Sequence, residues 1–400
     1  SAGEMFTRDS MSDLDRAETV GFLEPLWQKM LARMASGRDI DTGVLQQLAD
    51  EYPLPLLKEG GYANAGFAIE QGIIDGTKTY PEYRAYMIER FVVDGEAERE
   101  TYPHITAGAY LAQLDDPQQD SGDAVAVVNA QVLLTRGEQR PGIAGADDIA
   151  NLLRRAYEDE DTRALVLRVS SPGGGVIASD LVREELLAAK SRGLPVVASM
   201  GDIAASGGMW VSSPADRIFA APTTITGSIG VAVVFPTAEN LFDYLGIQHD
   251  GVTTSKHAGW GLHRPTDEEL DKLFFSRSET IYRRFIDVVS EGRELEVPFV
   301  RSIAGGRVWI GSTAQELGLV DEMGTLDDAI AHAAELAALE DYRVNYIKRE
   351  LSFGEQFLAD MMADAPVTVS VDPGVSDLYR QIEAVLAPLV GVSQPRVTVM

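Results

Sequence analysis

Hydrophobic and polar positions alternate between two periods across the middle of the chain, residues 123–230. Short apolar runs predict strands at 123–129, 164–169, 194–199 and 217–220. Helical spacing between these runs predicts helices at 146–158 and 177–191, the second closed by Gly193. Strands that alternate with helices of this length indicate βα units with right-handed crossovers and a parallel sheet.

The remaining residues are expected to be mainly helical, and they contain two similar octapeptides. Residues 266–338 have helical spacing, and 342–346 read as a strand ahead of two amphipathic helices. The octapeptide AQELGLVD at 314–321 resembles AIEQGIID at 68–75, and an acidic amphipathic helix follows each. Self-similarity of this kind indicates two related segments.

The two similar octapeptides suggest a division of the chain into three parts. Residues 1–115 are the helical C-terminal part of a truncated first repeat, and residues 120–338 are a complete second repeat. The polar, proline-containing stretch 115–123 links them, and residues 339–400 form a C-terminal extension. We therefore expect an α/β fold of repeated βα units with a parallel sheet, plus helical segments from the partial repeat.

The strongly acidic composition argues against one class of partner, nucleic acid. With 62 acidic residues against 34 basic ones, the formal net charge is −28, which argues against a nucleic-acid partner because phosphates need a basic surface. The chain has no cysteine, so thiol chemistry, disulfides and cysteine-based zinc sites are excluded. No apolar run reaches the ~18 residues of a membrane span, and we expect the chain to be soluble by itself.

One hydroxyl stands out beyond the third predicted strand. Ser206 lies in GDIAASGGMW (201–210), surrounded by alanine and glycine. Two interpretations are open: a turn where backbones pack closely and only small residues fit, or a nucleophile that a bulky substrate must reach. The glycine loop 170–175 follows the second strand, and ligands gather at the carboxyl ends of parallel strands. We therefore expect this loop and Ser206 at one edge of the sheet.

A serine hydroxyl needs a base, and donors for the developing oxyanion, before it can attack a carbonyl. The backbone N–H of Gly207 is one candidate donor, and Gly173 or Gly174 could supply a second, because glycine allows close approach to a substrate. The five histidines form no recognisable Ser-His-Asp arrangement, and no pair has the HExxH spacing of a catalytic metal site. We expect neither a metal nor a cofactor.

Lysine is the alternative base, if burial keeps it neutral. The chain has seven lysines. Among them only Lys256, in TTSKHAG (253–259), follows a strand of the segment that contains Ser206. An exposed loop lysine is the simpler interpretation of the same residue.

Three motifs together resemble one known family. VSSPGGG (169–175), SMGDIAASGGMW (199–210) and TGSIG (226–230) are similar, in this order and spacing, to signal peptide peptidase A, also called protease IV. The resemblance covers essentially the whole chain and is greatest to the long, two-repeat form of Gram-negative bacteria. It implies the fold of the Clp protease and crotonase superfamily and a Ser-Lys dyad. It also implies Ser206 as nucleophile, with Gly173 and Gly207 as oxyanion donors.

The resemblance gives two places for the base. In the long form, the family's lysine lies directly ahead of a segment similar to SAGEMFTRD (1–9), which places it just upstream of Ser1. In the short form, the lysine aligns near Ala258, two residues past Lys256. Lys256 is therefore one candidate, and the base, like a membrane anchor, is expected upstream of Ser1.

The resemblance implies a serine endopeptidase that degrades cleaved signal peptides and other apolar peptides at the membrane. It implies a homo-oligomer whose sites form between repeats or subunits. It also implies a place at the bacterial inner membrane, with the catalytic part on the periplasmic side. Two alternatives keep the same fold: a non-catalytic subunit or scaffold, and a crotonase-type acyl-CoA enzyme. The low basic content and the lack of an obvious phosphate or adenine site disfavour the acyl-CoA enzyme.

Overall fold

The structure is a computed structural model of the chain. It describes residues 4, 8–51, 65–91, 102, 104–105, 110, 122–137, 145–233, 237–252, 254, 261–263 and 267–348. All of these residues lie within one compact unit. The two helices expected in the C-terminal extension lie outside the described residues, as does most of the expected linker at 115–123.

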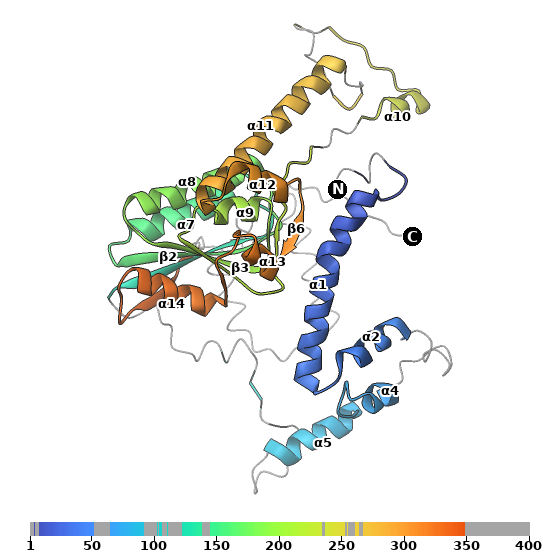
Figure 1. Cartoon of the computed structure of the whole chain (residues 1–400), viewed down its shortest axis with the longest axis vertical. Helices are drawn as coiled ribbons and strands as arrows, with labels where there is room; N and C mark the ends of the chain where they lie inside the picture. Colours follow the sequence, from blue (N-terminus) through green and yellow to red (C-terminus); the bar gives the residue numbers. More distant parts are fainter. Residues whose placement is uncertain are drawn as a thin grey trace, which may run out of the picture. The chain divides into compact units, whose positions relative to one another are not determined.

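A mostly parallel sheet forms the centre of the described chain (Figure 1). Its strands are β1 (Ala124–Gln131), β2 (Thr162–Ser171), β3 (Val196–Ala205), β4 (Arg217–Ala220), β5 (Ile225–Gly227), β6 (Val308–Ile310), β7 (Glu322–Met323) and β8 (Arg343–Tyr346). The order is β6-β5-β3-β2-β1-β8, and β4 pairs with both β3 and β7. Within this sheet β5 and β6 pair antiparallel, whereas β1, β2 and β3 pair parallel. The expected α/β fold is confirmed.

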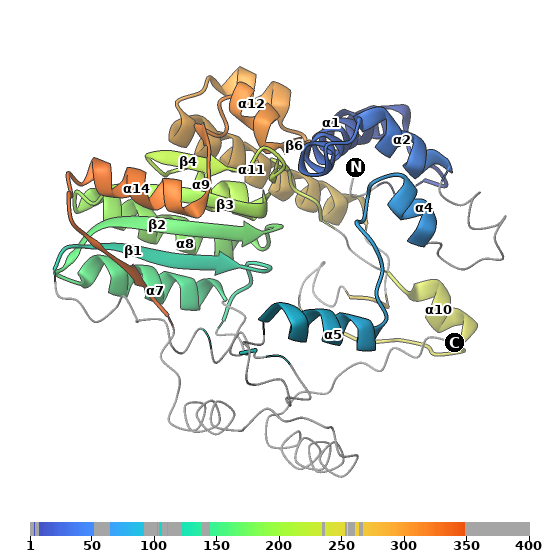
Figure 2. The same ribbon diagram turned by 90° about the horizontal axis from the view of Figure 1, so that it is seen from below.

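Helices cover both faces of the sheet. The segment that forms the sheet contains the helices α7 (Ala146–Glu158), α8 (Val176–Ser191), α9 (Gly207–Ser212), α10 (Glu239–Tyr244), α11 (Glu268–Arg293), α12 (Val297–Ile303), α13 (Gly311–Glu316) and α14 (Leu326–Leu336), of which α10 does not contribute to the core. Figure 2 shows α7 and α8 on one side of β1 and β2, with α14 on the other. Buried apolar residues therefore occupy both faces of the strands, as two-sided coverage requires.

The two faces can be followed along β1. Val125 and Val127 belong to the apolar cluster that includes Ile330 of α14. Ala126 and Val128 belong to the opposite cluster, which holds side chains of α7, α8, α9 and α11. Because successive residues of a strand point to opposite faces, this alternation explains why β1 reads as a continuous apolar run in the sequence.

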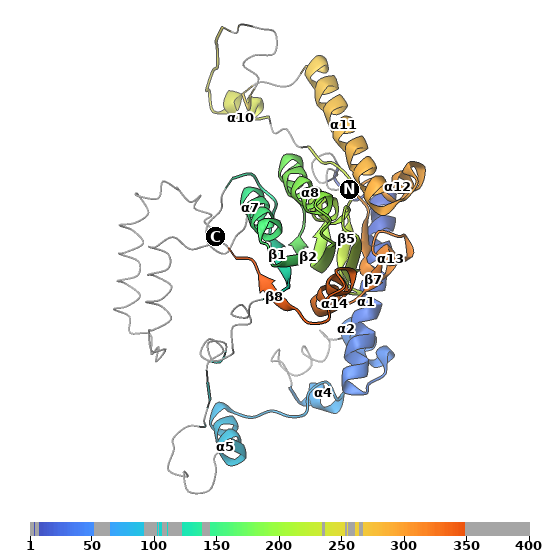
Figure 3. The same cartoon turned by 90° about the vertical axis from the view of Figure 1, so that its left-hand side faces the viewer.

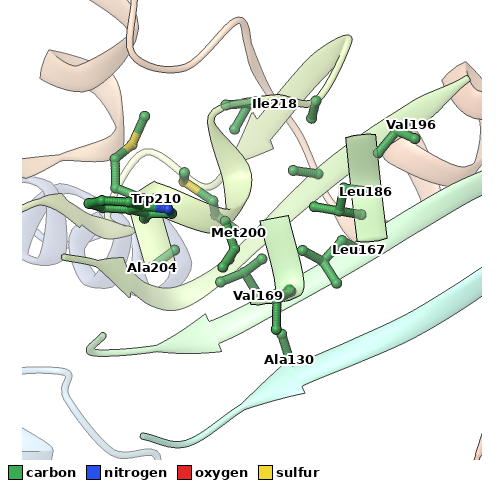
Figure 4. Close-up of a cluster of buried hydrophobic side chains, with 14 of the residues drawn as sticks. Ala130, Leu167, Val169, Leu186, Val196, Met200, Ala204, Trp210 and Ile218 are labelled. Atoms are coloured by element: carbon green, nitrogen blue, oxygen red, sulfur yellow. The ribbon is translucent and has the colours of Figure 1, made fainter. Parts of the chain in front are cut away.

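The larger core cluster reaches the end of β3. Met200 and Ala204 of β3 lie close to Trp210 of α9 (Figure 4). The Trp210 ring contacts the ring of Phe285 on α11, with centroids 4.8 Å apart, and its indole N–H donates to Asp180 on α8 at 3.2 Å. The core thus anchors the elements on both sides of Ser206.

The structure extends some predicted elements and adds others. The helix at 146–158 and the strand at 217–220 have the predicted bounds. β3 continues six residues past the predicted end at 199, because its last residues pair with β5. The expectation that 266–338 is wholly helical is wrong at β6 and β7, which are too short to show a period of two. β8 confirms the strand expected at 342–346 and pairs with β1 (Figure 3).

The described part of residues 8–91 is mainly helical. It comprises α1 (Asp13–Arg38), α2 (Thr42–Glu51), α4 (Ala65–Glu70) and α5 (Tyr80–Phe91). Among the described residues, no helix is both long and apolar enough to cross a membrane.

The two octapeptides are also similar in the local structure around them. α1 and α11 both have 26 residues, and each ends at an arginine that is followed by a residue in the left-handed region. Arg38 at the end of α1 pairs with Asp75, the last residue of the first octapeptide, and Arg293 at the end of α11 pairs with Asp321, the last residue of the second. The same ion pair therefore closes both copies of the motif.

The helices after the octapeptides also begin alike. At the start of α5, Thr79 donates its N–H and hydroxyl to the Glu82 carboxylate. At the start of α14, Thr325 donates the same two groups to Asp328. These matching helix starts support two related segments, while the boundaries at 115, 120 and 338 remain a prediction.

Candidate active site

Ser206 forms a sharp turn between the sheet and a buried helix. It follows the last residue of β3 and precedes α9, and its side chain is half-buried. Its backbone has φ 51° and ψ −116°, a conformation that residues other than glycine rarely adopt. The Ser206 N–H donates to the Gly227 carbonyl at 2.9 Å and the Ser206 carbonyl accepts from the Trp210 N–H at 3.0 Å. The strained turn is therefore fixed from both sides.

The glycine loop after β2 touches this turn directly. A Cβ atom on Gly173 would lie 2.7 Å from Ser206 Cβ and 2.8 Å from the Gly207 backbone nitrogen. A Cβ on Gly208 would lie 2.8 Å from the Ser171 carbonyl oxygen. Close packing thus explains the small residues around Ser206, and the same packing brings the glycine backbone next to its hydroxyl. The two interpretations of this stretch are compatible, and the expected meeting of the two loops at one edge of the sheet is confirmed.

The backbone amides around Ser206 Oγ differ in their hydrogen bonds. The Gly173 N–H donates to Ser171 Oγ at 3.1 Å, and Ser171 is fully buried. Within the described part of the chain, the N–H groups of Gly174 and Gly207 donate no hydrogen bond. A developing oxyanion at Ser206 can use these two amides directly, whereas the Gly173 N–H must share or exchange its bond to Ser171. The roles of Gly173 and Gly207 as oxyanion donors remain predictions.

The loop at the end of β5 also supports the Ser206 turn. Gly227 has φ 76°, and a Cβ there would lie 2.7 Å from Trp309 Cδ1. The next residue, Ser228, has φ 51° and donates its N–H to the Arg307 carbonyl at 2.6 Å. Ser228 therefore shapes the backbone of this Gly-flanked turn. Arg307 and Trp309 carry no sequence signal for this role, because only the fold brings β6 beside β5.

The two described lysines between residues 120 and 338 pair with acidic side chains and not with Ser206. Lys190 donates to the Pro214 carbonyl at 2.7 Å and pairs with Asp216 at 2.8 Å. Lys272 pairs with Glu268 within α11. Among the described residues, no lysine or histidine side chain forms a hydrogen bond with Ser206. Lys256 lies outside the described residues, so its role as base remains a prediction.

Comparison with known proteins places the chain in a family. The model of "Peptidase family S49" matches residues 188–340, a range that contains Ser206 but not the glycine loop. A putative protease of Synechocystis is 32% identical over 226 residues, which cover 54% of this chain and 81% of that protein. The chain belongs to peptidase family S49.

Two further relatives show how far the S49 likeness extends. Protease 4 of Salmonella typhi is 36% identical over 394 residues, 98% of this chain and 61% of that protein. A putative signal peptide peptidase SppA of Enterococcus faecium is 32% identical over 220 residues, 53% of this chain and 62% of that protein. The chain thus spans about three fifths of the length of each of these two S49 relatives.

Proposed function

We propose that this chain is the catalytic part of a serine endopeptidase in which Ser206 is the nucleophile. One observation carries the proposal: Ser206 stands in a strained turn at the carboxyl edge of the sheet, against the backbone of Gly173. Backbone strain of this kind concentrates at functional sites, where surrounding structure maintains it. Membership of family S49 and the protease names of the relatives support the same reaction.

The geometry supports a two-step hydrolysis through an acyl-enzyme. Ser206 Oγ attacks the carbonyl carbon of the peptide bond while its proton passes to a neutral lysine. The N–H groups of Gly207 and of Gly173 or Gly174 donate to the oxyanion. When the C–N bond breaks, the leaving amine takes the proton from the lysine, and an ester of Ser206 remains. Water then attacks the ester, gives a proton to the lysine, and releases the acid as Ser206 regains its hydrogen.

The base is proposed to be a lysine ahead of Ser1, with Lys256 as the second candidate. In a chain that carries the upstream residues, we expect Lys256→Ala to keep hydrolysis of an apolar fluorogenic peptide within about threefold. Without those residues, kcat is expected to fall by about a hundredfold or more, the usual contribution of a general base. Robust hydrolysis by the 400-residue chain that disappears in Lys256→Ala would instead assign the base to Lys256.

Apolar peptides, including cleaved signal peptides, are the proposed substrates. Three exposed apolar side chains border the glycine loop: Val132 and Leu133 just beyond β1, and Ile177 at the start of α8. The backbone of this border is fixed, since the Leu134 N–H donates to the Gly173 carbonyl at 2.8 Å and the Gly175 N–H donates to the Leu134 carbonyl at 2.9 Å. Such a rim suits the apolar side chains of a bound peptide.

A homo-oligomer is proposed from the equivalence of α1 and α11. α1 packs against β6. Because α1 and α11 have the same length, their residues can be matched by position along the helix. Glu18 and Val20 of α1 then correspond to Leu273 and Phe275 of α11. These two side chains are 59% and 73% exposed, and burial against a second copy would remove them from water. Light scattering that gives only a monomer would contradict this. Membrane association on the periplasmic side of the inner membrane rests on the family resemblance alone.

A further inference from the structure

The backbone of Arg307 is tied to the loop that follows β5. The Ser228 N–H donates to the Arg307 carbonyl at 2.6 Å. One residue earlier, the Gly306 N–H donates to the Ile229 carbonyl at 3.0 Å. These two bonds continue the antiparallel pairing of β5 and β6 and fix the position of the Arg307 peptide relative to residues 228–229.

The same loop positions Ser206. The Gly227 carbonyl accepts the Ser206 N–H at 2.9 Å. Gly227 packs so closely against β6 that a side chain would not fit, because a Cβ there would lie 3.0 Å from the Arg307 carbonyl oxygen and 2.7 Å from Trp309. Gly227 and Ser228 both have positive φ, at 76° and 51°. A displacement of the Arg307 peptide therefore acts directly on the backbone that holds the nucleophile.

The side chain of Arg307 reaches the N-terminal segment. Its Nε donates to Glu18 Oε1 on α1 at 2.9 Å, and its Nη1 donates to the Ser302 carbonyl. The two paired side chains are 36% and 26% exposed, so solvent screens this ion pair less than a fully exposed one. Figures 1 and 2 both place α1 beside β6. One residue thus contacts α1 with its side chain and the Ser206 loop with its backbone.

We infer that Arg307 is a positioning residue that fixes α1 relative to the nucleophile loop. Glu18 and Arg307 are 289 residues apart in the chain, so this ion pair joins the N-terminal helical segment to the sheet-forming segment. The inference rests on the proposed function in one respect, because the catalytic lysine is proposed to enter from just ahead of Ser1. Arg307 then sets where that lysine arrives relative to Ser206 Oγ.

A kinetic experiment tests the role in catalysis. In the chain with its upstream residues, Arg307→Gln and Glu18→Gln are each expected to lower kcat about tenfold with KM changed less than twofold, because only transition-state geometry is lost. The double variant should lose no more than either single one, and the exchanged pair Glu18→Arg with Arg307→Glu should recover most of the activity. Arg301→Gln, at an exposed arginine on neighbouring α12, is the control and should match the parent. Equal kcat in all variants would overturn the role in catalysis.

A distance measurement tests the positioning without any activity. The 400-residue chain has no cysteine, so spin labels can be attached at Leu23→Cys on α1 and Ile177→Cys beside the glycine loop, both exposed. A single narrow distance distribution is expected with the native pair, and a broader or shifted one with Arg307→Gln or Glu18→Gln. Unchanged distributions in both variants would overturn the inference even in an active enzyme. If the distance depends on the ion pair but the unlabelled chain with its upstream residues shows no hydrolysis, the positioning is upheld and the proposed function is rejected instead.

Discussion

Ser206→Ala is expected to lower kcat/KM for an apolar fluorogenic peptide by about three orders of magnitude or more. Alanine retains the backbone turn but removes the Oγ atom that forms the acyl-enzyme, so substrate binding should persist while chemistry stops. The measurement is steady-state hydrolysis in the form of the protein that carries its base.

Two other serines provide the controls for this result. Ser191 is exposed at the end of α8, and Ser191→Ala should hydrolyse the peptide like the parent. Ser228→Ala should keep most of the activity, because the structure gives Ser228 a backbone role through its N–H. If Ser228→Ala were inactive and Ser206→Ala active, the assignment of the nucleophile would be wrong.

Gly173→Ala is expected to lower activity by about a hundredfold or more, the scale of losing a preorganised oxyanion site. The added methyl would lie 2.7 Å from Ser206 Cβ and 3.0 Å from Ser206 Oγ. Gly173 also has φ +117°, where alanine is strained at a cost of about 1–3 kcal/mol in the free energy of unfolding. The two loops must therefore separate, which removes the contact that defines the site.

Gly193→Ala separates the effect of backbone strain at a positive φ from the effect of the contact with Ser206. Gly193 has φ +84° in the turn before β3, and no atom lies within 4 Å of a Cβ added there. This variant should lose about 1–2 kcal/mol of stability and retain the activity of the parent, as measured by denaturant unfolding and hydrolysis in parallel. Equal activity in Gly173→Ala and Gly193→Ala would show that the contact with Ser206 has no catalytic importance.

The sequence predicts the parts of the fold whose periodicity is long and regular. The helix at 146–158 and the strand at 217–220 match because each has a clear apolar face or run. β3 is longer than predicted because 200–205 is rich in small residues, and its extension comes from pairing with β5. β5, β6 and β7 have two or three residues each, too few to show any period, and they form only where the sheet provides a partner.

The candidate site was predictable to the same extent. Ser206 and Gly173 could be placed together because both follow strands of a parallel sheet, whose carboxyl ends share one edge. The bond between the Gly173 N–H and Ser171 Oγ depends on loop geometry that spacing does not encode. The link from Glu18 to Arg307 spans almost the whole described chain, and a single sequence contains no local sign of it.

Covalent labelling with a fluorophosphonate tests the central claim most directly. An activated serine Oγ displaces fluoride from phosphorus, so the adduct marks the nucleophile, and digestion followed by mass spectrometry locates it. In the form that hydrolyses peptides, we expect one adduct, on Ser206, formed at the same rate at which hydrolysis is lost. Loss of hydrolysis with the adduct on any other residue, or with Ser206 unmodified, would contradict the account.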